Sequence, residues 1–119
     1  MRSEQAIELA KRLLDDPNAP ESDCRAVAHI AYYSVYHLVC AYFGTDPGKD
    51  YSESSHRDVR LHLRALDPTG SPPEIREAKR VFERLWRLRI RADYEWNRAF
   101  TSEDAEDAFE WANGVFGRM

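Results

Sequence analysis

Apolar residues recur at intervals of three and four positions in five stretches of the chain. This spacing places apolar side chains on one face of a helix, so it predicts five amphipathic helices. Proline and glycine interrupt helices, and residues 16–20, Gly44 and residues 67–73 supply the breaks between them. The expected N-terminal caps are Ser22, Ser52 or Ser54, and Thr101 or Ser102. The predicted helices cover about residues 3–15, 22–43, 54–66, 74–92 and 102–116.

The second predicted helix, residues 22–43, carries apolar residues on almost every face. A helix that is apolar all round is covered on several sides, so we expect it at the centre of the fold. The sequence shows no strand-like alternation, internal repeat or low-complexity tract. Short connections favour antiparallel packing of neighbouring helices. The sequence therefore predicts an all-α fold: a single domain over residues 1–119, built as an antiparallel up-and-down bundle of four to five helices.

Composition narrows the possible locations of the protein. With 119 residues, 43% of them hydrophobic, the chain is long enough for one modest core. Charged residues make up 32%, and no apolar run approaches the roughly 20 residues that a membrane-spanning helix needs. Residues 1–14 alternate charged and aliphatic positions and lack the apolar centre of a signal peptide. We therefore expect a cytoplasmic protein that does not bind a membrane.

Charge is distributed unevenly, although the net charge is only -4. Residues 76–91 are densely basic and residues 103–110 are acidic. A mildly acidic protein can carry a local basic face, so this distribution permits nucleic-acid binding without requiring it. Five arginines fall opposite the apolar stripe of the fourth helix and are expected to face solvent: Arg76, Arg80, Arg84, Arg87 and Arg91.

Arg89 departs from this arrangement. At about 100° per residue it falls beside Phe82 and Leu85, on the apolar face of the fourth helix. A guanidinium there needs partners, because burying an unpaired charge is costly. Asp93 lies four residues further on, shares this face, and is the expected ion-pair partner. Two interpretations stay open: an internal brace of the helix, or an arginine at the rim of a cleft that presents its planar fork to a phosphate.

Three motifs occur in a fixed order along the chain. The second helix contains Arg25 and then the run AYYSVYH at residues 31–37, Ser55-His56 opens the third helix, and LRIRADY at residues 88–94 ends the fourth. Together they resemble the HEPN superfamily, specifically its small bacterial stand-alone proteins, over about residues 4–117. This resemblance implies a bundle of four or five helices that forms a homodimer.

The resemblance also bears on catalysis. In ribonuclease members of the superfamily, an arginine and a following histidine from each subunit meet in a composite cleft. There the arginine stabilises phosphate charge and the histidine does acid–base work on the attacking 2'-hydroxyl. The resemblance assigns the arginine to Arg89, whereas the histidine position, five residues on, holds Tyr94. A tyrosine, with a reference pKa near ~10, is a poor proton shuttle at neutral pH, which argues against ribonuclease activity.

A partner protein is implied as well. Many similar HEPN proteins are paired with a minimal nucleotidyltransferase in two-gene toxin–antitoxin modules. In one form of that pairing, a tyrosine two residues after the motif histidine is modified, and here Trp96 occupies this position. A minimal nucleotidyltransferase is therefore a weakened candidate partner beside a second copy of the chain.

The candidate site residues gather around the LRIRADY motif. The expected ligand-binding residues for RNA or a nucleotide are Arg89, Asp93, Tyr94, Arg91 and Tyr33. The candidate catalytic residues are Arg89 and Tyr94, with His37 and His56 as replacements for the missing histidine. The chain has no glycine-rich phosphate loop and no zinc-type Cys/His spacing, so we expect neither a cofactor nor a metal.

Three functions stay open. The favoured one is a dimeric protein with a degenerate ribonuclease motif that binds RNA or a nucleotide in a stress, defence or toxin–antitoxin system. The second is an active, metal-independent endoribonuclease that uses another base, such as His37 or Tyr94. The third is a purely structural interaction subunit that pairs with a nucleotidyltransferase, in which Arg89 and Asp93 form an internal brace.

Overall fold

The computed structural model describes residues 1–44 and 53–119. This part of the chain contains α helices and one short 3-10 helix, and no strand. The helices are α1 (Ser3–Leu14), α2 (Glu21–Phe43), α3 (Glu53–Ala65), η1 (Pro68–Gly70), α4 (Pro73–Tyr94) and α5 (Ser102–Phe116). The predicted all-α fold is confirmed. None of the helices in the described ranges is both long enough and apolar enough to cross a membrane.

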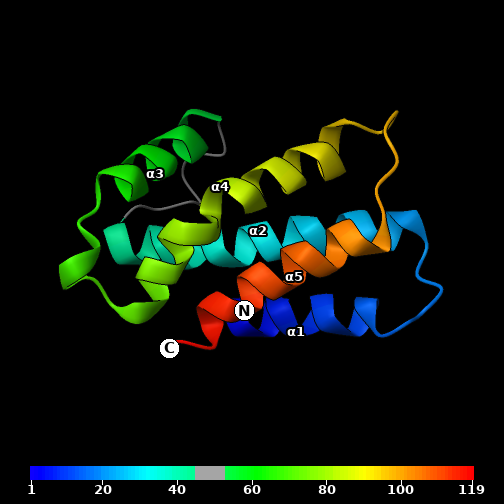
Figure 1. Cartoon of the computed structure of the whole chain (residues 1–119), viewed down its shortest axis with the longest axis horizontal. Coiled ribbons are helices and arrows are strands. Elements are labelled where there is room, and N and C mark those ends of the chain that lie inside the picture. The colour runs from blue at the N-terminus through cyan, green and yellow to red at the C-terminus, as the bar shows by residue number, and fades with distance from the viewer. Residues whose placement is uncertain (45–52) are drawn as a thin grey trace.

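Helix α2 lies at the centre of the bundle and packs against α1, α4 and α5. Figure 1 shows that α1, α2, α4 and α5 alternate in direction, while α3 sits beside the N-terminal half of α4. The all-round apolar pattern of α2 therefore predicted its position correctly. Its buried residues come from every face of the helix: Cys24, Val27, Ala28, Ala31, Tyr32, Ser34, Val35, Tyr36, Val39 and Cys40.

The two ends of α2 show how the sequence sets its length. The helix begins one residue before the predicted Ser22 cap, because Pro20 occupies the cap position in an extended conformation, with φ -67° and ψ 161°. Ser22 lies in the first turn and caps nothing. The C-terminal end is as predicted, since Gly44 adopts φ 73°, a left-handed conformation that glycine accepts without steric cost.

The later helices begin and end close to their predicted bounds. Thr101 caps α5, because its hydroxyl accepts a hydrogen bond from the Asp104 N–H at 3.1 Å and the Asp104 carboxylate accepts one from the Thr101 N–H at 3.0 Å. For α3, Ser54 lies inside the helix rather than before it, and Ser52 falls outside the described residues. The predicted break at 67–73 contains η1.

Helix α4 carries the residues on which the site depends. It starts at Pro73, where proline suits the first helical turn, and ends at Tyr94, two residues beyond the predicted end. The segment 95–100 then returns the chain to α5. In this segment Phe100 is buried, whereas Trp96 is 77% exposed.

Candidate functional site at the end of helices α2 and α4

Arg89 is buried on the inner face of α4, where its helical position predicts it, with only 4% of its surface exposed. Its Nε donates to Asp93 Oδ2 at 3.0 Å, and its Nη2 donates to the Tyr33 hydroxyl at 2.9 Å. A longer contact of 3.4 Å joins Nη2 to the Tyr94 hydroxyl. Three tyrosine rings surround the guanidinium carbon at 5.3–5.6 Å from their centroids, which is cation–π range: Tyr32, Tyr33 and Tyr94. The predicted pairing of Arg89 with Asp93 is confirmed.

Asp93 also joins α4 to α2. The Nδ1 atom of His29 lies 2.9 Å from Asp93 Oδ2 and 3.1 Å from Oδ1. Asp93 Oδ2 is thus shared between a guanidinium and an imidazole, and Arg89, Asp93 and His29 form a continuous chain of polar contacts. His29 is the outer member, with half of its side chain in solvent.

A second set of contacts runs inward from Tyr33. The Tyr33 hydroxyl lies 3.5 Å from Nε2 of His56, and the hydroxyl of the buried Tyr32 lies 2.7 Å from Nδ1 of the same ring. The Tyr36 ring packs on His56 with a centroid distance of 4.5 Å. His56 is itself buried, so it anchors α3 to α2 through aromatic and hydrogen-bonding contacts.

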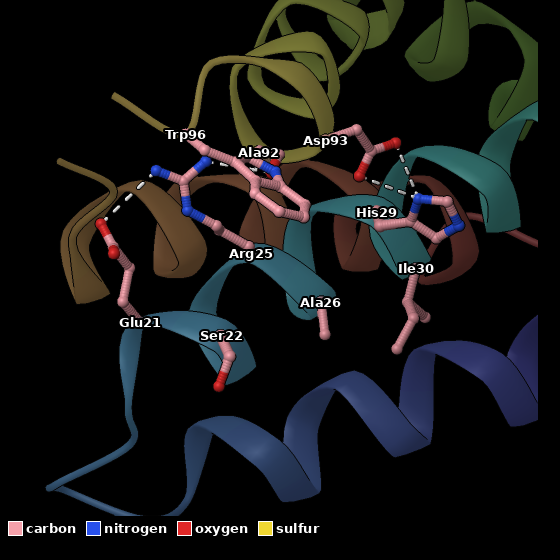
Figure 2. A pocket seen from close by; sticks show the side chains of 9 residues that line it. All are labelled: Glu21, Ser22, Arg25, Ala26, His29, Ile30, Ala92, Asp93 and Trp96. Atoms are coloured by element: carbon pink, nitrogen blue, oxygen red, sulfur yellow. Dashed lines mark hydrogen bonds and ion pairs between the residues drawn. The ribbon is translucent and has the colours of Figure 1, made fainter. Parts of the chain in front are cut away.

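An open cleft of about 650 Å³ lies beside His29 and Asp93. Figure 2 shows His29 on α2 facing Asp93 on α4, with Trp96 next to Arg25 and Ala92. A second hollow of about 400 Å³ includes Arg2, Tyr33 and His37 in its lining and shares His29 and Ile30 with the cleft. The cleft is lined by Glu21, Ser22, Arg25, Ala26, His29, Ile30, Ala92, Asp93 and Trp96.

Arg25 fixes the end of α4 that carries Asp93. Its Nη1 donates to the carbonyl oxygens of Arg91 and Ala92 at 2.9 and 3.0 Å, and Nη2 reaches the carbonyl of Arg98. The Arg91 carbonyl also accepts a hydrogen bond from the Glu95 N–H at 3.1 Å, whereas Ala92 lies in the last turn of α4, where carbonyls lack intrahelical donors. The Arg25 of the first motif is thus a structural cap that joins α2 to α4.

Glu21 fixes the segment after α4 from the same side. Its Oε1 accepts a hydrogen bond from the Phe100 N–H at 2.7 Å, and this bond holds the pKa of Glu21 below its ordinary value. Arg25 lies 3.5 Å away and adds its positive charge to the effect. Arg25 contacts the carbonyls of Glu95 and Arg98, and Glu21 contacts the N–H of Phe100. These contacts fix the backbone of segment 95–100, which places Trp96 at the cleft.

The structure brings most of the predicted site residues together. Arg89, Asp93, Tyr94, Tyr33 and His56 form one cluster through the contacts above. Tyr94 is at its outer edge, with 64% of its surface exposed.

Two of the predicted residues lie outside this cluster. Arg91 points toward α5, where its Nη2 lies 3.3 Å from Asp104 Oδ2, so it is neither fully solvated nor part of the cluster. Burial opposes ionisation of Asp104, but hydrogen bonds from Thr101 and the Arg91 charge outweigh it and lower the pKa of this carboxyl. His37 is exposed and lines the second hollow, where it contacts the rings of Tyr33 and Tyr36.

His29, which the structure places beside Asp93, was not among the site residues predicted from the sequence. A usable signal was present, because His29 lies four residues after Arg25 and four before Tyr33, which places all three on one side of α2. Within the described ranges, no group of three His, Cys, Asp or Glu residues is arranged to hold a metal ion.

The arrangement combines groups that suit a phosphate-bearing ligand. A guanidinium can donate to phosphate oxygens, an exposed indole can stack on a base, and a half-exposed imidazole can bind or transfer a proton. Here these groups are Arg89, Trp96 and His29, at the junction of α2 with the end of α4.

Comparison with known proteins identifies the family. No curated protein and no solved structure matches the chain. A family model described as the HEPN domain, in contrast, matches residues 1–119, the whole chain. The resemblance inferred from residues 31–37 and 88–94 agrees with this match. With its all-α bundle and its matching sequence, the chain belongs to the HEPN domain family.

Proposed function

We propose that this protein binds RNA or a nucleotide in the cleft between α2 and the end of α4, as a homodimer with a degenerate ribonuclease motif. The observation that carries the proposal is Arg89, a guanidinium held at 4% exposure by Asp93 and Tyr33 beside a cleft of about 650 Å³. Membership of the HEPN family supports an RNA-related function. The stress, defence or toxin–antitoxin setting is part of the proposal and rests on the same family resemblance.

The outer edge of the cluster offers a route for a ligand to Arg89. Tyr94 is the last residue of α4, is largely exposed, and lies 3.4 Å from Arg89 Nη2, a weak contact. A phosphate oxygen that displaced the Tyr94 hydroxyl would gain a charge-assisted hydrogen bond in its place. Trp96, two residues further on and more exposed still, would stack on the attached base.

The experiment compares Arg89→Met with Arg87→Met. Methionine keeps most of the apolar volume of the side chain, and Arg87 is an exposed arginine about 200° away on the same helix. Binding of a fluorescein-labelled single-stranded RNA and of ATP would be measured by anisotropy and calorimetry at low salt, with size-exclusion chromatography and light scattering for the dimer. We expect Arg89→Met to weaken binding at least about 10-fold and Arg87→Met to change it less than about 3-fold. Wild-type protein that binds neither ligand at low salt would overturn the proposal.

A structural interaction subunit is the second candidate, and one observation favours it. Asp93 already neutralises Arg89 from within the chain, so the pair could serve only to fix α4 against α2. This function predicts that Arg89→Met leaves RNA and nucleotide binding unchanged from the wild type. It also predicts a stable complex with a partner protein, for which a minimal nucleotidyltransferase is the candidate.

A further inference from the structure

The contact between His29 and Asp93 determines which ring nitrogen of His29 carries a proton. An ionised carboxylate only accepts hydrogen bonds, and both Asp93 oxygens lie within 3.1 Å of His29 Nδ1. Nδ1 must therefore donate, and in the neutral ring Nε2 is left with a lone pair. Arg89 holds the negative charge of Asp93 in place through its own bond to Oδ2. The three side chains together orient the imidazole as a proton acceptor.

The His29 ring is half-exposed and lies at the cleft. Figure 2 shows the second ring nitrogen turned away from Asp93. The side chain is 49% exposed and lines both the cleft and the neighbouring hollow. Among the described residues, none makes a hydrogen bond to this nitrogen. A ligand lying along α2 through the two hollows would pass over it.

The other candidate proton acceptors of the site are less suited. Both ring nitrogens of His56 face tyrosine hydroxyls, and the residue is buried. The Tyr94 hydroxyl lies 3.4 Å from the buried Arg89 Nη2, and Tyr94 is not among the residues that line the cleft. His37 is exposed, but no described carboxylate orients its ring. Among these residues, His29 combines an orienting carboxylate with a half-exposed ring that lines the cleft.

We propose that His29 is the general base of a ribonuclease centre in this cleft and supplies the proton transfer that the missing motif histidine would have performed. This inference rests on the proposed RNA binding. His29 Nε2 accepts the proton of a 2'-hydroxyl, and the 2'-oxygen forms a bond to the adjacent phosphorus. The bond from phosphorus to the 5'-oxygen breaks, and that oxygen takes a proton from water. The products are a 2',3'-cyclic phosphate and a 5'-hydroxyl, and the imidazolium then returns its proton to solvent.

In this centre, Asp93 is a positioning residue. It touches no reacting atom, but it fixes the His29 ring and stabilises the imidazolium that forms. Arg89 supports Asp93 from the buried side. The arginine and the aspartate of the LRIRADY motif thus act through a histidine that lies on a different helix.

The test measures cleavage and binding side by side, with His29→Gln and the matched control His62→Gln, since His62 is an exposed histidine of α3 that lines neither hollow. A 5'-labelled single-stranded RNA is incubated with each protein in EDTA, and the products are analysed by gel and mass spectrometry for a 2',3'-cyclic phosphate. We expect the wild type and His62→Gln to cleave at similar rates, and His29→Gln to be slower by about 100-fold or more. Anisotropy should show that both variants bind the RNA within about 3-fold of the wild type.

Three results would overturn the inference, and they show whether the proposed RNA binding fails with it. If the wild type binds RNA but leaves it intact, or if His29→Gln cleaves as fast as the wild type, His29 is not the base while RNA binding stands. If the wild type does not bind RNA, the proposed function fails together with the inference.

The role of Asp93 has a spectroscopic readout that a purely structural residue would not affect. Long-range nitrogen–proton NMR correlations report which nitrogen of a neutral histidine carries the proton. We expect neutral His29 to be protonated at Nδ1 in the wild type, and to move toward the Nε2-protonated form in Asp93→Asn. Neutral His29 protonated at Nε2 in the wild type would contradict the proposed base.

Discussion

Asp93 Oδ2 accepts a hydrogen bond from Arg89 Nε at 3.0 Å, and the two partners differ sharply in their access to solvent. The Arg89 side chain is 4% exposed, whereas 21% of the Asp93 side chain is exposed. Asp93 also keeps His29 as a second partner at 2.9 Å. The ion pair therefore has a buried cationic end and a partly solvated anionic end.

This difference in burial predicts different losses of stability when Asp93 or Arg89 is replaced. Asp93→Ala removes the Asp93 carboxylate from a guanidinium that is only 4% exposed, and we expect it to lower the free energy of unfolding by about 3 kcal/mol. Arg89→Met fills the same space with an apolar side chain and leaves Asp93 hydrated and bonded to His29, so we expect a change below about 1 kcal/mol. Urea denaturation followed by circular dichroism measures both. Equal losses in the two variants would contradict this account.

Arg89 shows which part of the site the sequence could reveal. Its burial and its pairing with Asp93 follow from helical geometry within one element, because residues four apart share a face. The position of Trp96 was harder to predict, because an aromatic residue in a linker is equally compatible with an anchor and with an exposed side chain. The capping of α2 by Pro20 shifted a predicted bound by only one residue.

The contacts between helices are the part of the site that the sequence did not predict. His29 meets Asp93 from 64 positions away in the chain, and Arg25 meets the Arg91 carbonyl from 66 positions away. Helical periodicity assigns a residue to a face of its own helix but does not say which residue of another helix that face meets. The sequence therefore predicted the helical bundle and the contact between Arg89 and Asp93 within α4. The contacts of His29 and Arg25 with α4 follow only from the packing of α2 against that helix.

Arg25 lies outside the hydrophobic core, but because it caps α4 we expect its replacement to lower the stability of the protein markedly. Its guanidinium donates to carbonyl oxygens of both Arg91 and Ala92, and lysine cannot reproduce this forked arrangement. We expect Arg25→Lys to cost about 2 kcal/mol of stability, because the Ala92 carbonyl loses its side-chain donor and the Arg91 carbonyl keeps only the Glu95 N–H. Thermal melting of Arg25→Lys beside Arg87→Lys measures the effect. A melting temperature unchanged in both variants would show that solvent caps α4 equally well.

The hydrogen bond of the Tyr32 hydroxyl predicts a loss of stability when that hydroxyl is removed from the buried aromatic cluster. It lies 2.7 Å from His56 Nδ1, and both residues are buried. Tyr32→Phe keeps the ring and removes this hydrogen bond from the interior, which we expect to cost about 1–3 kcal/mol. The control is Tyr42→Phe, since the Tyr42 ring is exposed and its loss of a hydroxyl should cost less than about 0.5 kcal/mol. Chemical denaturation of both proteins would contradict the prediction if their unfolding midpoints were the same.

The capping box of α5 offers a local test of the fold. Thr101→Ala removes the hydroxyl that accepts from the Asp104 N–H, and replacing such a cap costs about 1 kcal/mol. Ser102→Ala is the matched control, because Ser102 is the first residue of the helix rather than its cap. Differential scanning calorimetry should show a lower melting temperature for Thr101→Ala alone. A larger loss for Ser102→Ala would place the start of α5 one residue later.

Glu77 gives the bundle a pH-dependent contribution to stability. The hydrogen bond from Arg80 holds the pKa of this buried carboxyl below its ordinary value of 4.5, against the opposing effect of burial. Arg118 at the C-terminal end of the chain adds a second contact, with its Nε 3.1 Å from Glu77 Oε2. Because Glu77 binds its proton less readily in the folded than in the unfolded chain, its ionised form stabilises the fold.

The sign of this contribution fixes the expected pH profile. Stability from Glu77 is fully present above pH 4.5 and is lost as the pH falls through the lowered pKa of the folded state. We expect Glu77→Gln to be less stable than the wild type by about 1–2 kcal/mol at neutral pH, and the gap to narrow steadily in acid. Glu74→Gln is the control, since Glu74 lies in the first turn of the same helix without an ion-pair partner among the described residues. Urea titrations at a series of pH values measure the gap directly. A gap that stays constant into acid would mean that Glu77 acts through its shape and its hydrogen bonds rather than through its charge.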